Sequence, residues 1–186
     1  MRGSTHRQAG EALRHPCAPE RGRAGEGRLM ADGPGAPGAE GLPWDLADPF
    51  VIEVVVEPGQ IDVLGHTNNV HYLAWLQDCA WAHSCARGVD ADLMVGLGCA
   101  MAVRETRMTY LGATFAGDAL LVGDWITASD GRLRAQRSFQ IIRPADRTTV
   151  LRAVIDYVCI TIESGRPTRM PDAFVRAYTD DVRAAH

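Results

Sequence analysis

The stretch GQIDVLGHTNNVHYLAWLQDCAWAH (59–83) joins a polar loop directly to an apolar run. The loop carries an aspartate, a histidine and two adjacent asparagines. From Asn69 to about Arg87 there is no Gly or Pro, apolar residues occupy nearly every side of a helical wheel, and Gly88 supplies a stop signal. A helix that is apolar nearly all round is normally surrounded by protein. The sequence therefore predicts a long buried helix with hydrogen-bonding side chains immediately before its N-terminus.

Strand patterns lie on both sides of this helix. Before it, apolar and polar residues alternate in PFVIEVVVEPG (49–59), and Pro58-Gly59 ends the run. After it come strand-like runs at 100–111, 119–129, 132–143 and 148–162, with a hairpin turn at Asp130-Gly131. The last run is apolar on both faces, as a central strand would be. A short helix at 171–178 completes the pattern.

This order of elements predicts an α+β fold, in which one antiparallel sheet of about five strands curls around the long helix. Such a sheet leaves one side of the helix and one sheet edge uncovered, and pairing with a second copy would cover both. We assign the domain to residues 46–178 and a C-terminal tail to 179–186. Residues 1–45 are rich in Gly and Pro and poor in large apolar side chains, so we expect a disordered extension there.

Composition argues against several other classes of protein. The formal net charge of −4 offers no basic face for nucleic acid. No apolar run approaches the roughly 18 residues of a membrane span, and the N-terminus lacks the apolar core of a secretory signal. No CxxC pair is present, so we expect neither a zinc site nor another metal. We therefore expect a cytoplasmic protein without a membrane span.

The stretch IDVLGHTNNVHYLAWLQDCAW (61–81) resembles the signature of the hotdog-fold acyl thioesterases, approximately DxDxxGHxNNxxYxxWxE. This is the 4-hydroxybenzoyl-CoA thioesterase-like group, with its long-chain acyl-CoA and acyl-carrier-protein relatives. TRMTYLGATFAGDALLVGDW (106–125) and CITIESGRPTRMP (159–171) resemble later strands of the same family. The resemblance, which covers roughly residues 50–178, implies a hotdog fold. It also implies hydrolysis of an acyl-CoA or acyl-carrier-protein thioester by a homodimer or homotetramer, without a cofactor.

The resemblance assigns catalytic roles to Asp62, His66, Asn68 and Asn69. Asp62 falls on the family's catalytic carboxylate, which either activates a water or attacks the thioester carbonyl itself. The helix that begins near Asn68 or Asn69 presents unpaired backbone N–H groups, which would stabilise the oxyanion of the tetrahedral intermediate. His66 either orients Asp62 and contacts substrate or simply forms a hydrogen bond in a turn. Asn68 is also well suited to a plain N-cap.

Gly65, Val70 and Tyr72 belong to the same motif and are predicted to contact substrate. Gly65 would supply a backbone geometry that a side chain blocks. Tyr72, one turn into a buried helix, is equally suited to the core. Glu105 is the nearest acid on its strand, because Arg107 stands where many relatives have a carboxylate.

Arginines in predicted turns are candidates for binding the phosphates of CoA. They are Arg143, Arg147, Arg166 and Arg169, of which Arg143 and Arg166 are the preferred pair. The acyl group would lie against the helix and the inner sheet face, where Trp75, Trp81, Met101 and Phe139 are available, although each also suits an ordinary core. His83 has no counterpart in the motif and is expected in packing or at the surface.

Two alternatives remain at this point. One is a hotdog domain that binds or senses acyl-CoA without turnover, although a retained Asp62 argues for chemistry. The other is a hotdog hydratase or dehydratase, whose DxNPxH-like loop is absent here.

Overall fold

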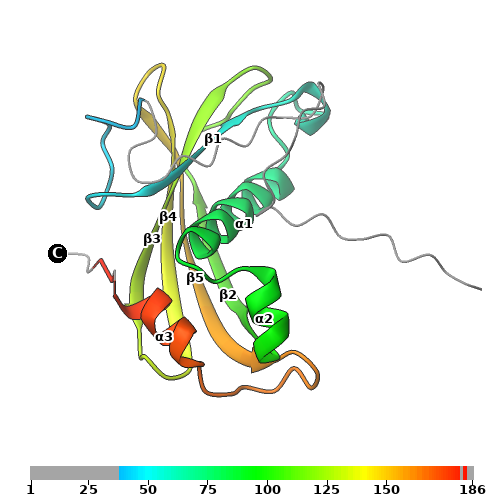
Figure 1. Cartoon of the computed structure of the whole chain (residues 1–186). Helices are drawn as coiled ribbons and strands as arrows, with labels where there is room; N and C mark the ends of the chain where they lie inside the picture. The colour runs from blue at the N-terminus through cyan, green and yellow to red at the C-terminus, as the bar shows by residue number, and fades with distance from the viewer. Residues whose placement is uncertain (1–37, 181, 184–186) are drawn as a thin grey trace, which may run out of the picture.

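In the computed structural model, which describes residues 38–180, 182 and 183, helix α1 (Asn69–Ala86) lies against one face of a five-stranded antiparallel sheet (Figure 1). The strands are β1 (Phe50–Val55), β2 (Cys99–Tyr110), β3 (Ala119–Ser129), β4 (Arg134–Arg143) and β5 (Thr148–Thr161). Their order is β1-β3-β4-β5-β2, so that β1 and β2 form the two edges. The remaining elements are the 3-10 turn η1 (Pro58–Gln60) and the helices α2 (Ala91–Leu97) and α3 (Asp172–Thr179). The predicted α+β architecture is confirmed.

The main core lies between α1 and the inner face of the sheet, which is the face that α1 covers. From α1 it receives Tyr72, Trp75, Leu76, Cys79 and Ala80, which meet buried side chains of β1, β3, β4 and β5. The opposite side of α1 is less covered than its all-round apolar sequence predicts, and Val70 and Ala74 are exposed there. Within one chain, α1 is therefore packed on one side only.

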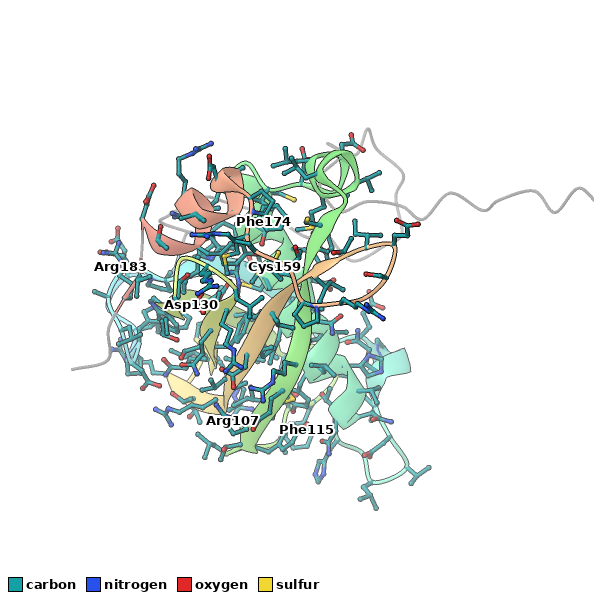
Figure 2. All side chains as sticks on the ribbon, turned by 90° about the horizontal axis from the view of Figure 1, so that it is seen from below. Arg107, Phe115, Asp130, Cys159, Phe174 and Arg183 are labelled. Carbon is teal, nitrogen blue, oxygen red and sulfur yellow. The ribbon has the colours of Figure 1, made fainter. Side chains whose placement is uncertain are left out.

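Helix α2 was not predicted from the sequence. Asp90 caps it, because its Oδ1 accepts a hydrogen bond from the Leu93 N–H at 2.8 Å, and Gly98 ends it in the left-handed region at φ 64°. Met94 of α2 joins a second core cluster with α3 and the adjoining ends of the strands. Cys159 and Phe174, both labelled in Figure 2, belong to this cluster.

The outer face of the sheet, opposite α1, is partly covered by the N-terminal segment (residues 38–48). Trp44 lies over Gly123, where a Cβ atom would come within 2.7 Å of the indole ring. The Trp44 and Trp125 rings meet edge to face with centroids 5.8 Å apart, and Asp45 pairs with Arg152 at 2.6 and 2.8 Å. Residues 38–45, which we assigned to a disordered extension, thus pack on the sheet because one aromatic and one acidic side chain find specific partners. Residues 1–37 lie outside the described part of the chain.

The C-terminal helix was predicted at 171–178 and forms at Asp172–Thr179. The assigned tail therefore begins within α3, and beyond it the Arg183 N–H donates to the Ile126 carbonyl at 2.8 Å. Residues 184–186 lie outside the described part of the chain. In the part that is described, no helix combines the length and apolar character needed to cross a membrane.

Candidate active site

The polar loop (residues 61–69) forms a tight turn that leads into α1. An antiparallel bridge between Ile61 and Thr67 closes the turn. Within it, the Asp62 N–H donates to the His66 carbonyl at 2.8 Å, and the Gly65 N–H donates to the Asp62 carbonyl at 3.0 Å. Gly65 has φ 80°, a left-handed backbone conformation that residues other than glycine rarely adopt. The loop therefore requires glycine for its backbone, as the sequence predicted.

The Asp62 carboxylate is half-buried and takes part in this turn. Its Oδ1 accepts hydrogen bonds from the Leu64 N–H at 2.8 Å and, more weakly, from the His66 N–H at 3.4 Å. No residue in the described part of the chain hydrogen-bonds to Oδ2. One carboxylate oxygen therefore holds the turn, while the other is available to a ligand or a water.

At the start of α1, Asn68 is the N-cap, and its Oδ1 accepts from the Val70 N–H at 3.2 Å. The N–H group of Asn69, the first helical residue, has no acceptor among the residues described, and Asn69 is exposed. Helix N-termini favour negative charge, because their unpaired N–H groups and the helix dipole point the same way. The Asn69 N–H is thus the free donor at this end of α1.

His66 is exposed and its ring meets the edge of the Phe115 ring, with centroids 5.4 Å apart and planes at 73°. Phe115 belongs to the loop between β2 and β3. No side-chain hydrogen bond from His66 to Asp62 is present among the described contacts. The His66 ring is therefore held by an aromatic contact beside the turn.

A buried hydroxyl network ties the polar loop to the β2–β3 loop. Thr67 Oγ1 lies 2.6 Å from Thr114 Oγ1, and the Tyr72 hydroxyl lies 2.8 Å from the same Thr114 atom. The sequence analysis missed both threonines, because nothing local marks a pairing across 47 residues. Tyr72 is buried and packs against Trp75 and Tyr110, so its position is that of a core residue.

Glu105 does not lie with these residues. A bulge in β2 between Val103 and Glu105 shifts the register, so that Glu105 pairs with Asp156 on the outer face of the sheet. There Arg107 bridges the two acids, at 2.6 Å to Glu105 and 3.2 Å to Asp156. The structure therefore places Glu105 on the side of the sheet away from α1.

The two preferred arginines also differ in position. Arg143 lies beside the β2–β3 loop. It binds Asp146 at 2.8 Å and Asp118 at 3.2 Å, and it donates to the Ala113 carbonyl at 3.1 Å. Its guanidinium therefore clamps the β2–β3 loop and holds the pKa of Asp146 down at about 2. Arg166 is exposed and follows the end of β5. At that end Thr161 pairs with Cys99, the first residue of β2, whereas Tyr110 is the last residue of β2. Within one chain it is remote from the polar loop.

An apolar pocket of about 400 Å³ lies farther along α1, between that helix, α2, and the paired strands β2 and β5. Two of the four residues predicted to face an acyl group, Trp81 and Met101, line it. The other two, Trp75 and Phe139, are buried in the main core.

One end of this pocket meets a polar group of side chains that the sequence analysis did not assemble. We call it the buried polar cluster: His83, Ser84, Asp124, Arg137 and Tyr178. Arg137 donates to Asp124 Oδ2 in a very short contact and to Ser84 Oγ at 3.0 Å, and His83 Nδ1 lies 3.0 Å from the same Asp124 oxygen. Burial lowers the pKa of Arg137, but the Asp124 carboxylate, together with Tyr178 and Tyr157, outweighs this, and that pKa lies above its ordinary value. The cluster therefore carries a permanent ion pair inside the fold.

Metal ligands do not gather in either region. Among residues 38–180, 182 and 183, no group of three or more His, Cys, Asp or Glu side chains could hold a metal ion. The arrangement at the polar loop offers a carboxylate oxygen and a backbone donor, which suits chemistry at a carbonyl group.

Comparison with known proteins gives a consistent result. Residues 56–178 match the thioesterase-like superfamily. No functionally curated protein matches the chain. Among solved structures, the 1,4-dihydroxy-2-naphthoyl-CoA thioesterase Slr0204 of Synechocystis is similar, with 18% identity and a TM-score of 0.63 over 70% of this chain and 95% of that chain.

Two further structures have the same fold. SAV2348 of Staphylococcus aureus, solved in complex with CoA, has 18% identity and a TM-score of 0.66 over 74% of this chain and 87% of that one. The probable thioesterase YbaW of Escherichia coli has 19% identity and a TM-score of 0.60 over 71% and 98%. The predicted hotdog fold is confirmed.

Proposed function

Because the chain belongs to the thioesterase-like superfamily, we propose that it hydrolyses an acyl-CoA or acyl-carrier-protein thioester at the N-terminus of α1. The observation that carries this proposal is that the polar loop holds two groups without a hydrogen-bond partner. They are Asp62 Oδ2 and the Asn69 N–H, neither of which has a partner in the described part of the chain. A nucleophile or base next to an oxyanion donor is the minimum that acyl transfer requires.

In the first form of the mechanism, Asp62 is a general base. Its carboxylate accepts a proton from a water as the water oxygen bonds to the thioester carbonyl carbon, and the Asn69 N–H stabilises the resulting oxyanion. The intermediate then collapses, the C–S bond breaks, and the thiolate takes up the proton held by Asp62. The products are the free carboxylic acid and the thiol.

In the second form, Asp62 attacks the carbonyl carbon directly. The thiolate leaves and a mixed anhydride forms, which water then hydrolyses to regenerate the carboxylate. Both forms use the same two groups, and both leave Oδ1 to hold the turn through the Leu64 N–H. His66 lies beside the turn and would contact the thioester rather than orient Asp62, because its ring rests on Phe115.

Coenzyme A is the carrier favoured by the comparisons, since one similar protein was solved with CoA and another acts on an aromatic acyl-CoA. Arg166 is the exposed candidate for its phosphates, because no other side chain in the described part engages its guanidinium. Arg143 has two carboxylate partners, which favours a structural role for it. Val70 and Gly65 would line the approach to the thioester.

We further propose that the working unit contains two copies paired along β2. This edge strand has twelve residues, and among the described residues no strand pairs with the edge that faces away from β5. The exposed side chains of Val103, Tyr110 and Ile162 lie along or beside it. An unpaired edge of that length is normally covered. The N-terminal segment already covers part of the outer face, which favours a homodimer over a homotetramer built through that face. Light scattering should give twice the chain mass, and a monomer would contradict this.

The test of the proposed chemistry is thiol release from a panel of short, long and aromatic acyl-CoAs by wild type and Asp62→Asn. Asparagine retains the Oδ1 acceptor that holds the turn, so the variant should fold normally. We expect its turnover to fall by about 10²- to 10⁴-fold, the usual contribution of a positioned base.

A matched control is Asp130→Asn. Asp130 Oδ1 likewise holds a turn, by accepting from the N–H groups of Arg132, Leu133 and Arg134, but it lies in the β3–β4 hairpin. This variant should keep wild-type turnover. Equal rates for wild type and Asp62→Asn would remove Asp62 from the mechanism. Absence of turnover with intact binding would favour the non-catalytic acyl-CoA-binding alternative.

A further inference from the structure

The apolar pocket lies on the same side of α1 as Val70, which follows the residue that carries the proposed oxyanion donor. Residues three or four apart share a helix face, so Val70, Leu73, Gln77 and Ser84 form one row along α1. Gln77 and Ser84 line the pocket. At about 1.5 Å per residue, the row runs about 10 Å from Val70 to Gln77 and about 20 Å to Ser84. An acyl chain with its carbonyl at the start of α1 can follow this row into the pocket.

The walls of the pocket are apolar, but one end is not. Trp81, Met94, Met101 and Ile162 are among the apolar lining residues, and the volume of about 400 Å³ is typical of small-molecule sites. Four further lining residues carry polar groups and are almost fully buried: Ser84 (6% exposed), Arg137 (1%), Tyr157 (8%) and Tyr178 (3%). A pocket for a plain hydrocarbon would have no use for such groups, because each costs free energy to bury.

Most of these groups satisfy one another, but Tyr157 does not. Ser84 Oγ accepts from Arg137 and lies 3.3 Å from the Tyr178 hydroxyl. The Tyr157 hydroxyl makes no hydrogen bond to any residue that the structure describes. Burial raises the pKa of Tyr157, so its hydroxyl keeps its proton and can donate. The pocket lining therefore offers an accessible hydroxyl donor that has no acceptor among the described residues.

The charge of this end selects the kind of acceptor. Arg137 is already neutralised by Asp124, and the second Asp124 oxygen, Oδ1, is buried without any hydrogen-bond partner among the described residues. A carboxylate on the ligand would meet no unpaired cation there, and the Asp124 carboxylate, which lies behind Arg137 and does not line the pocket, would repel it. A neutral oxygen meets neither penalty.

We propose that this enzyme acts on long-chain acyl thioesters that carry a neutral oxygen function, a hydroxyl or keto group, toward the far end of the chain. The oxygen accepts a hydrogen bond from Tyr157 at the inner end of the pocket. This inference rests on the proposed function for the reaction, and it adds the class of acyl group.

The test compares straight-chain acyl-CoAs of increasing length, each with its terminally hydroxylated and terminally carboxylated counterpart, in wild type and Tyr157→Phe. Wild type should prefer the hydroxylated chain in kcat/KM at the length that reaches the pocket end. Tyr157→Phe should reduce that preference about 3- to 10-fold, the worth of one hydrogen bond. It should not lower kcat/KM for the plain chain, because the phenyl ring keeps the packing and the lost hydroxyl has no partner on that chain, whereas an equal fall for both chains would overturn the inference. Ser138→Ala, which removes a hydroxyl that pairs with Thr127 on the outer face, should leave the preference intact.

Binding of non-hydrolysable thioether analogues of the same chains, measured by calorimetry, separates this inference from the proposed reaction. If no ester is hydrolysed, the preference and its loss in Tyr157→Phe should still be seen in the dissociation constants. Equal affinity for plain and hydroxylated chains at every length would overturn the inference. A preference for the carboxylated chain, or a preference that Tyr157→Phe leaves unchanged, would overturn it as well.

Discussion

The polar loop and the buried polar cluster use similar side chains in opposite ways. The loop is local, since nine consecutive residues form its turn and helix start, and it leaves a carboxylate oxygen and an N–H group free. The buried polar cluster draws on α1, β3, β4 and α3, and nearly every polar atom in it has a partner. Exposure allows free groups because water satisfies them, whereas burial demands mutual pairing. The first arrangement suits chemistry and the second suits a fixed shape.

The largest effect should come from breaking the cluster. Arg137→Met removes the buried cation and leaves the buried Asp124 carboxylate with only His83 as a partner, so the free energy of unfolding should fall by about 3–5 kcal/mol. Urea unfolding followed by tryptophan fluorescence measures this. In the polar loop, Asp62→Asn should change the same quantity by less than about 0.5 kcal/mol.

A double variant tests whether pairing is the reason. Adding Asp124→Asn to Arg137→Met removes the stranded charge and should recover a substantial part of the lost stability. If the double variant is instead as unstable as the sum of the two single variants, the two side chains are not coupled, and the cluster is held by packing alone.

The next effect concerns the backbone of the polar loop. Gly65→Ala should lower the free energy of unfolding by about 1–2 kcal/mol, because φ is 80° at this position. An added Cβ would meet no atom within 4 Å, so strain rather than a clash is the cause. Gly59→Ala is the matched control, since it has equal space and no positive φ. A comparable loss in both variants would show that the left-handed turn is not what Gly65 supplies.

Much of the fold could be predicted because its signals are local. The continuous apolar run gave α1, Asn68 gave its cap, and alternation gave the strands. Helix α2 escaped notice because seven residues form no stable helix alone, and its packing against β2 comes from distant sequence. Glu105 was predicted only as the nearest acid on its strand, and its place on the outer face could not be read from the sequence, since a one-residue bulge reverses the faces and has no sequence signature here.

The buried polar cluster did leave a signal, although an incomplete one. Arg137 has the same parity as Ala135, Phe139 and Ile141, all of which face the core, so alternation predicts an inward arginine. Asp124 likewise shares parity with inward Val122. Two inward charges of opposite sign on paired strands imply a contact. The sequence could not show that His83 and Ser84 complete it, because the approach of α1 to the sheet is a tertiary property.

Asp78 is intermediate between the two regions and should give the smallest effect. It lies on α1 and is half-buried, and burial raises its pKa above 3.8. A raised pKa means that the folded state holds the proton more tightly than the unfolded state, so stability falls as pH rises through the folded pKa. Asp78→Asn removes that cost. The variant should therefore have a slightly higher Tm than wild type at neutral pH and an equal Tm below pH 3.8, where both side chains are neutral. Thermal unfolding across this pH range measures the difference. An Asp78→Asn variant that is less stable than wild type at neutral pH would mean that this carboxylate has a favourable partner in the working protein, as Asp62 has in the Leu64 N–H of the polar loop.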